Sequence, residues 1–250
     1  MRLLITNDDG INAEGIYILA KELEKNHEVT IIAPDNQRSA CGHSITLTRP
    51  LILKEVKLSN LNSKAYSLDG TPADCVKFAL DKLLKGKIDM VVSGVNKGVN
   101  LGTDVIYSGT VSAAIEAAVY NVPSIAISSE FIGDKENYDV AAKTVESVLV
   151  NLKDKAVKDD VVLNINIPMI PEDKIKGIKV CKIGSRTYNN VYLERENSEG
   201  QVTYEIVGDI KEGSEKDTDV YYFKEGYITL TPLHYDLTNF KILKTVEEWF

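Results

Sequence analysis

The stretch Met1-Arg-Leu-Leu-Ile-Thr-Asn-Asp-Asp-Gly10 decides how the rest of this 250-residue chain is interpreted. Leu3 to Thr6 is a short apolar, β-branched run, which predicts a buried strand, and it stops abruptly at Asn7-Asp8-Asp9-Gly10. In an open parallel sheet, ligands bind in the crevice beyond the carboxyl ends of the strands. Two adjacent carboxylates there repel each other unless a cation lies between them, and Mg²⁺ and Mn²⁺ select carboxylate and amide oxygens. The alternative is a plain surface turn, because Asn, Asp and Gly are common turn residues.

Composition and charge narrow the class of protein. The chain is 44% hydrophobic and 26% charged, and it has neither an apolar run of about 18 residues nor a signal-peptide pattern at its start. Its cysteines, Cys41, Cys75 and Cys181, match neither a disulfide framework nor a zinc site. A cytoplasmic protein without a membrane span is therefore expected. The formal net charge of −8 argues against binding to a nucleic-acid polymer, which needs clustered Lys and Arg, but it does not exclude a small anionic ligand.

Strand-like and helical patterns alternate over about the first 170 residues. Apolar residues recur at helical spacing between Ile16 and Leu23, and a strand-like run follows at 27–33, so the first two strands are expected to be parallel neighbours. Thr71-Pro-Ala-Asp74 has the N-cap, proline and capping acid of a helix start. The further strand-like runs are 43–48, 51–57, 65–68, 88–92, 123–128 and 161–167. Such alternation predicts an α/β fold with a mostly parallel sheet flanked by helices.

The pattern changes near residue 170. Gly177 to Ile183 and Gln201 to Val207 are strand-like, and the polar, Asn- and Glu-rich segment between them is interpreted as a separator. A last strand and a short helix follow, with Thr238 as the candidate cap of that helix. The chain is therefore divided into an α/β core, residues 1–170, and a β-rich C-terminal part, residues 171–250. Exposed hairpins in the second part suit assembly into a homo-oligomer.

Three strand ends are expected to converge on one edge of the sheet. They carry Asp8 and Asp9, the loop 35–42 with Ser39, and the glycine-rich loop 93–102 with Asn96. Two carboxylates, a hydroxyl and an amide oxygen suit a hard metal ion with open positions for water and substrate. Taken singly, Ser39 and Asn96 are explained equally well by loop polarity and turn formation.

Ser108-Gly109-Thr110 follows the glycine-rich loop and opens a helix. The free N–H groups and the dipole of a helix N-terminus attract anions, although plain N-capping explains the same residues. A metal site beside a phosphate cradle suggests phosphoryl transfer to water. The chain has neither the P-loop of nucleoside triphosphatases nor the Gly-x-Ser-x-Gly nucleophile elbow of α/β-hydrolases.

Several motifs, taken together, resemble the survival protein SurE family of metal-dependent 5′/3′-nucleotidases. The match runs in order along nearly the whole chain, and the joint occurrence of the motifs is highly specific. They are Thr6-Asn-Asp-Asp-Gly10, Ala33-Pro-Asp35, Gly42-His-Ser-Ile-Thr46, Asp69-Gly-Thr-Pro-Ala-Asp-Cys-Val76, Val91-Val-Ser-Gly-Val-Asn-Lys-Gly-Val-Asn-Leu-Gly102, Tyr107-Ser-Gly-Thr-Val111, Asn164-Ile-Asn-Ile-Pro168, Thr218-Asp-Val220 and Gly226-Tyr-Ile-Thr-Leu-Thr-Pro-Leu233.

The resemblance implies a Rossmann-like α/β domain and a C-terminal oligomerisation part that builds dimers or tetramers. It also implies one divalent metal ion per subunit, Mg²⁺ or Mn²⁺, with nucleoside monophosphates as substrates and short polyphosphate as a further substrate of some members. The metal ligands that it implies are Asp8, Asp9, Ser39 and Asn96. The expected phosphate-binding residues are Asn96, Ser108, Gly109 and Thr110.

The expected activity is that of a 5′-nucleotidase in which a metal-activated water attacks the phosphorus of a nucleoside 5′-monophosphate. Asp8 and Asp9 are the expected catalytic residues, with 3′-nucleotidase and exopolyphosphatase reactions as side activities. Two alternatives remain at this stage. The chain could be a non-catalytic nucleotide-binding regulatory protein, or chiefly an assembly protein that interacts through its C-terminal hairpins.

Overall fold

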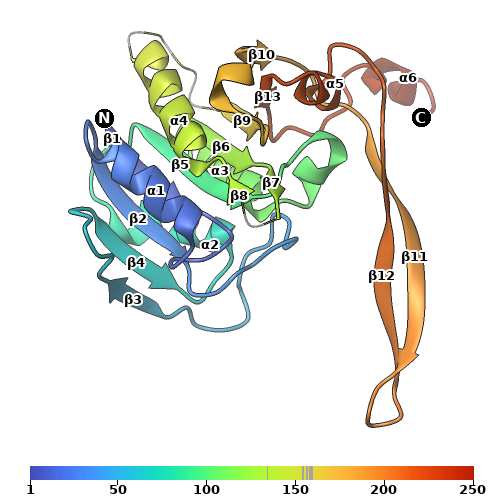
Figure 1. Ribbon diagram of the computed structural model, residues 1–250, viewed down its shortest axis with the longest axis horizontal. Coiled ribbons are helices and arrows are strands. Elements are labelled where there is room, and N and C mark those ends of the chain that lie inside the picture. Colours follow the sequence, from blue (N-terminus) through green and yellow to red (C-terminus); the bar gives the residue numbers. More distant parts are fainter. Residues whose placement is uncertain (134, 154, 156, 158–159) are drawn as a thin grey trace.

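The computed structural model describes residues 1–133, 135–153, 155, 157 and 160–250. Within these residues, nine strands form one sheet (Figure 1). Their spatial order is β10 (Ile178–Val180), β13 (Ile228–Leu233), β9 (Val162–Ile167), β6 (Ser124–Ser129), β5 (Met90–Lys97), β1 (Arg2–Thr6), β2 (Glu28–Pro34), β4 (Lys64–Leu68) and β3 (Leu53–Val56).

The six central strands, from β9 to β4, run parallel to one another, and β1 and β2 pair directly as expected. Antiparallel pairing is confined to the two sides, where β3 pairs with β4 and β13 with β9. The predicted α/β class with a mostly parallel sheet is confirmed. The division at residue 170 remains a prediction, and the structure adds that β10 and β13 lie in the same sheet as the strands of the first 170 residues.

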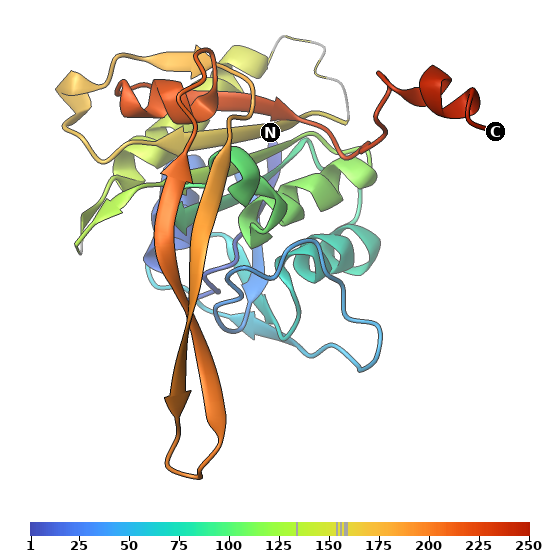
Figure 2. The same cartoon turned by 90° about the vertical axis from the view of Figure 1, so that its right-hand side faces the viewer.

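Helices cover both faces of the sheet, which makes the fold Rossmann-like (Figures 1 and 2). On one face α1 (Glu14–Leu23) contacts α4 (Tyr138–Leu152), and on the other α2 (Pro72–Phe78) contacts α3 (Gly109–Val119). The shorter elements in the described residues are η1 (Ala79–Leu83), η2 (Gly102–Ile106), η3 (Glu172–Lys174), α5 (Asp219–Lys224), α6 (Leu243–Glu247) and the small strands β7 (Phe131–Ile132) and β8 (Lys135–Glu136). No helix in the described part of the chain is long and apolar enough to cross a bilayer.

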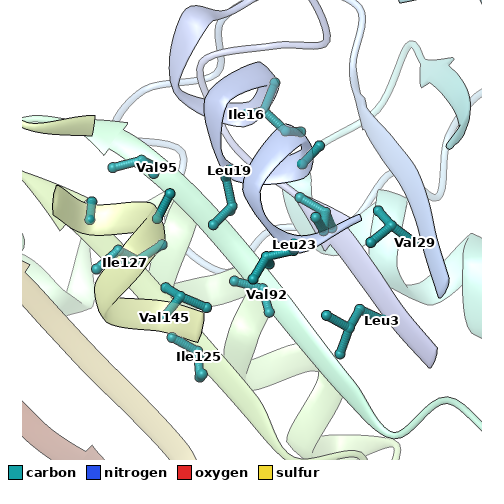
Figure 3. Packing of buried hydrophobic residues seen from close by; sticks show 14 of the residues in the cluster. Leu3, Ile16, Leu19, Leu23, Val29, Val92, Val95, Ile125, Ile127 and Val145 are labelled. Carbon is teal, nitrogen blue, oxygen red and sulfur yellow. The ribbon is translucent and has the colours of Figure 1, made fainter. Parts of the chain in front are cut away.

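The opening strand β1 shows why both faces need a helix layer. Its alternate side chains point to opposite faces of the sheet, so Leu3 and Ile5 join the core under α1 and α4, whereas Leu4 joins the core under α2 and α3. Figure 3 shows the first of these cores, with Leu19 of α1 and Val145 of α4 over the sheet. The carboxylates Asp8 and Asp9 come only after this buried strand has ended.

Two predicted boundaries were wrong. The run 43–48 forms no strand, because side chains of α2 and α3 hold it: Asp74 accepts hydrogen bonds from the N–H and hydroxyl of Thr46, and Glu116 pairs with His43 at 2.7 Å. The strand expected at 88–92 continues to Lys97 after a register shift between Ser93 and Asn96, so that Asn96 belongs to β5 rather than to a loop.

The C-terminal part contains a long antiparallel hairpin of β11 (Arg186–Glu196) and β12 (Val202–Glu212), which projects far from the sheet (Figures 1 and 2). The polar segment interpreted as a separator is in fact β11. Both faces of this hairpin are largely exposed, so neither strand needs the apolar alternation that identifies a half-buried strand. The final helix begins at Leu243, and Thr238 does not cap it.

Candidate active site

The turn after β1 carries two carboxylates, Asp8 and Asp9, that do not take part in the hydrogen bonds closing the turn. Asn7 closes the turn, because its amide donates to the Gly10 carbonyl at 2.9 Å and accepts from the Gly10 N–H at 3.1 Å. Gly10 has a φ of +97°, which an L side chain rarely adopts. The surface-turn interpretation therefore accounts for Asn7 and Gly10, whereas Asp8 and Asp9 take no part in closing the turn.

Asp8 lies under the N-terminus of α3. Its side chain is buried, with 4% of the residue exposed, and the hydroxyl of Thr110 donates to its Oδ1 at 2.5 Å. The close approach needs glycine at position 109, because a Cβ there would lie 2.8 Å from the Asp8 Cβ and 3.0 Å from its Oδ2. Burial raises the pKa of Asp8 to about 6; the Thr110 hydrogen bond opposes this rise, and the charge of Asp9 adds to it.

Asp9 is held by two neighbouring segments. Its Oδ2 accepts the backbone N–H of Lys97 at 3.0 Å, and its Oδ1 accepts the amide of Gln37 at 3.2 Å. The same Gln37 nitrogen donates to Ser39 Oγ at 3.0 Å, so one amide bridges Asp9 and Ser39. Burial raises the pKa of Asp9, and the Lys97 N–H acts against it. Gln37 was not among the predicted site residues.

The three predicted strand ends meet at one pocket of about 560 Å³. Its inner lining includes Asp8, Ser39, Asn96 and Ser108. The loop 35–42 is fixed there by the Arg38 N–H, which donates to the Asp8 carbonyl at 2.7 Å. The Asn96 amide nitrogen donates to the Gly98 carbonyl at 2.7 Å, so Oδ1 is the atom of this side chain suited to a cation.

The donor set fits a hard divalent cation. Asp8, Asp9, Ser39 and Asn96 offer only oxygen atoms, which Mg²⁺ and Mn²⁺ prefer. Burial raises the pKa of both carboxylates and so disfavours their ionised forms, a cost that a cation bound to them would offset. No group of three or more His, Cys, Asp or Glu residues suited to a metal occurs among the described residues, so the imidazole and thiolate sets typical of zinc are not found there.

Ser108, Gly109 and Thr110 take different positions at the start of α3. Ser108 is the N-cap, since its hydroxyl accepts the Val111 N–H at 3.1 Å, and it also lines the pocket. Thr110 is fully buried and its hydroxyl is committed to Asp8. What Gly109 and Thr110 can offer an anion is therefore their backbone N–H groups, which lie in the first helical turn.

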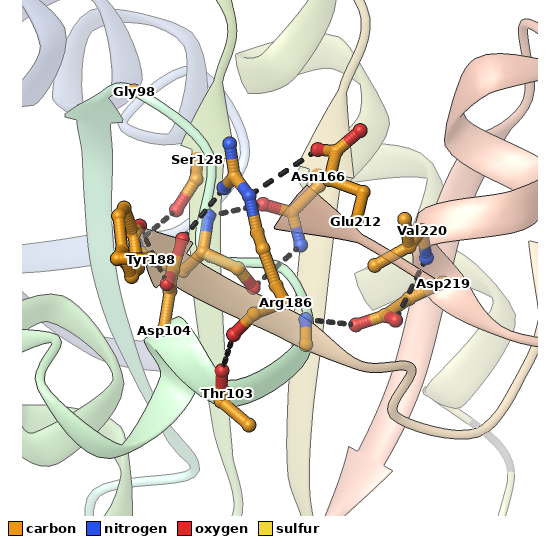
Figure 4. Close-up of polar contacts among 12 residues, drawn as sticks. Gly98, Thr103, Asp104, Ser128, Asn166, Arg186, Tyr188, Glu212, Asp219 and Val220 are labelled. Atoms are coloured by element: carbon orange, nitrogen blue, oxygen red, sulfur yellow. Dashed lines mark hydrogen bonds and ion pairs between the residues drawn. The ribbon is translucent and has the colours of Figure 1, made fainter. Parts of the chain in front are cut away.

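The segment 98–102, part of which lines the pocket, is held by a buried polar network that the sequence interpretation missed (Figure 4). The Asn100 N–H donates to Asn166 Oδ1 at 2.7 Å, and its amide donates to Ser128 Oγ at 2.8 Å. Asn164 donates to the Asn100 carbonyl at 2.9 Å. The signal was the Asn-Ile-Asn alternation, which places Asn164 and Asn166 on one face of β9. Asp219, fully buried at the start of α5, accepts the Gly102 N–H at 2.8 Å.

The raised pKa of Asp8 predicts that metal binding to this carboxylate would depend on pH. Metal binds the ionised carboxylate, so we expect affinity to fall by up to about tenfold per pH unit below about pH 6. Because the folded state holds this proton more tightly than the unfolded state, whose value is 3.8, the metal-free protein should gain stability as pH falls through 6 towards 4. Mn²⁺ titration and thermal unfolding in EDTA at several pH values measure both effects. A metal affinity that stays constant through this range would contradict the assignment.

Comparison with known proteins places the chain in a family. The family model described as survival protein SurE matches residues 3–190. The chain is 57% identical over 251 residues to a protein of Clostridium botulinum (strain Loch Maree / Type A3) named 5′-nucleotidase SurE, covering all of this chain and 99% of the relative. A protein of the same name from Clostridium tetani (strain Massachusetts / E88) is 50% identical over 250 residues, with full coverage of both. The crystal structure of the SurE protein from Aquifex aeolicus superposes with a TM-score of 0.84 at 36% identity, covering 100% of this chain and 99% of that one. The chain belongs to the survival protein SurE family.

Proposed function

We propose that the protein is a 5′-nucleotidase that hydrolyses nucleoside 5′-monophosphates with one divalent cation, Mg²⁺ or Mn²⁺, bound per chain. The observation that carries this proposal is the meeting of Asp8, Ser39 and Asn96 in one pocket with the N-terminus of α3. Membership in the SurE family, whose relatives at 50–57% identity are named 5′-nucleotidases, supports the nucleotidase activity. The metal ligands in this proposal are Asp8, Asp9, Ser39 and Asn96.

When bound, a divalent cation supplies Lewis-acid activation of the phosphate group and of a water molecule. The protein supplies the orientation. The Thr110 hydroxyl holds Asp8 at Oδ1, whereas the Lys97 N–H and the Gln37 amide hold Asp9 at Oδ2 and Oδ1. Because each carboxylate oxygen has two lone pairs, both side chains can still act as ligands or as proton acceptors. Gln37 holds Ser39 at a set distance from Asp9.

The start of α3 is the proposed phosphate cradle. Ser108 and the N–H groups of Gly109 and Thr110 lie where the helix dipole favours negative charge, and Asn96 borders the same pocket. Charge that builds on the phosphate oxygens during hydrolysis is stabilised by fixed donors of this kind. Because Thr110 also holds Asp8, one helix end both offers donors to the phosphate and positions one of the proposed metal ligands.

The same pocket could serve a regulatory protein that binds mononucleotide without turnover. Such a protein needs a cradle for phosphate, but it has no use for two adjacent carboxylates, one buried and one partly buried, whose ionised forms are disfavoured in the folded chain. A polyphosphate substrate is favoured less than a mononucleotide, because Lys97 is the only cationic residue among the described pocket residues, and it is paired with Glu136 at 2.8 Å.

Phosphate release from a panel of nucleoside 5′- and 3′-monophosphates and a short polyphosphate tests the proposal. We expect release that depends on Mg²⁺ or Mn²⁺, that stops when EDTA is added, and that is fastest with 5′-monophosphates. Retained binding of mononucleotide with no release under either metal would favour the regulatory alternative instead.

We also propose a homo-oligomer, dimer or tetramer, in the cytoplasm, assembled through the C-terminal part. Apolar side chains on the hairpin are open to solvent, among them Val191, Tyr204 and Ile206, each more than half exposed. Exposed apolar groups in one projecting element are typical of a surface that a partner covers. In this proposal the partner is a second copy of the chain.

A further inference from the structure

The pocket has two chemically different ends. The inner end carries the oxygen ligands and the start of α3. The outer end is lined by Tyr107 at the end of η2 and by Tyr188 and Asn190 of β11, together with Asp104. Tyr188 and Asn190 are two residues apart on one strand, so they face the same side. The base of the hairpin therefore forms one wall of the pocket.

The ring of Tyr188 is held rigidly in this wall (Figure 4). Its hydroxyl donates to Asp104 Oδ1 at 2.7 Å, while Arg186 pairs with Asp104 Oδ2 at 2.6 Å and with Glu212 at 3.3 Å. The Arg186 and Asp104 side chains are only 11% and 13% exposed, so this ion pair is shielded from solvent.

Tyr188 nevertheless keeps an open face. The residue is 44% exposed, and Tyr107, which also lines the pocket, is 61% exposed. Burial and the hydrogen bond to Asp104 raise the pKa of Tyr188 to about 12, so its hydroxyl remains protonated and continues to donate. A flat apolar surface that is fixed in orientation but not covered is suited to stacking on a planar ring.

We propose that Tyr188 is the nucleoside-binding platform of this site: the base of a nucleoside monophosphate stacks on its ring, with Asn190 and Tyr107 beside it. This inference rests on the proposed function, because the phosphate at the α3 end determines where the base lies. The volume of about 560 Å³ is in the range of pockets that enclose small ligands. Stacking on an aromatic ring tolerates every base, so the platform favours nucleotides over phosphate esters without a base, rather than one base over another.

Kinetics on substrates with and without a base test the proposal. The substrates are the four common nucleoside 5′-monophosphates and ribose 5-phosphate, and the variants are Tyr188→Ala and Tyr188→Leu. We expect KM for the nucleotides to rise about 5- to 150-fold, the range that corresponds to 1–3 kcal/mol per stacked base. The kcat values and all constants for ribose 5-phosphate should change less than about twofold. The Tyr188→Phe variant keeps the aromatic ring, and Asp104 still pairs with Arg186 in it. The KM of this variant for nucleotides should therefore rise less than about threefold.

Tyr192→Ala is the matched control, because Tyr192 lies on the same strand, is 61% exposed and does not line the pocket. Light scattering of every variant confirms that the assembly is unchanged. Equal losses on nucleotides and ribose 5-phosphate would show a structural role and overturn the proposal, as would an unchanged nucleotide KM in Tyr188→Leu. The wild-type protein is measured first. If it releases no phosphate from any of these esters, the proposed function is refuted, and this outcome is distinct from a failure of the Tyr188 proposal.

Discussion

Asp8→Asn is expected to reduce metal-dependent phosphate release about 10²- to 10⁴-fold. The change removes one of two anionic ligands in the proposed site, and a divalent cation contributes several kcal/mol to transition-state stabilisation, at 1.36 kcal/mol per factor of ten. The side chain keeps its shape, and the Thr110 hydroxyl can still donate to the amide oxygen. The loss should therefore lie in the chemistry rather than in the fold, which kcat at saturating Mn²⁺ and circular dichroism measure together.

The same substitution should stabilise the metal-free protein. At neutral pH the folded chain holds an ionised Asp8 whose pKa is about 6 rather than 3.8, a difference that costs roughly 3 kcal/mol. Asn carries no charge, so thermal unfolding in EDTA should occur at a higher temperature in the variant than in the wild type. Asp173→Asn is the control: Asp173 forms only an exposed ion pair with Lys174, and neither activity nor stability should change. Full activity in Asp8→Asn would refute the assignment of Asp8.

Gly109→Ala has the second large expected effect. The added Cβ would lie 2.8 Å from the Asp8 Cβ and 3.1 Å from the Cys41 sulfur, so either α3 or the Asp8 turn must move. Overpacking of this kind costs about 1–3 kcal/mol of stability. A shift of even about 1 Å between a phosphate cradle and the metal ligands can lower the rate about 10²-fold. Steady-state kinetics and denaturant unfolding give the two quantities.

A substitution elsewhere in α3 separates this clash from a general effect on the helix. Val119 is 48% exposed at the far end of α3, and Val119→Ala should leave the rate unchanged. If Gly109→Ala kept the wild-type rate and metal affinity, the close contact between α3 and Asp8 would have no catalytic importance.

Sequence reasoning could place the inner site because its chemistry is local to strand ends. Asp8 and Asp9 directly follow the apolar strand β1, and ligands bind in the crevice beyond the carboxyl ends of parallel strands. The expectation that Ser39, Asn96 and Ser108 meet there needed only the order of strands and helices. The structure brings them to one pocket.

What sequence reasoning missed depends on contacts between distant segments. Gln37 lies in no recognisable motif. Its role is visible only in the structure, where its amide bridges Asp9 and Ser39. One wall of the pocket is formed by β11, whose exposed faces show no hydrophobic periodicity. Nothing in the sequence therefore indicates that Tyr188 lines the same pocket as Asp104 of η2. Thr110 was expected to bind phosphate, and its hydroxyl is committed to Asp8, which leaves its backbone N–H for that role.

Calorimetric titration of the metal-depleted protein with Mn²⁺ tests the central claim most directly. The account predicts one ion bound per chain in the wild type and in Asp173→Asn, and binding too weak to saturate in Asp8→Asn. Two ions per chain, or unchanged affinity in Asp8→Asn, would contradict a single site built on Asp8, Asp9, Ser39 and Asn96.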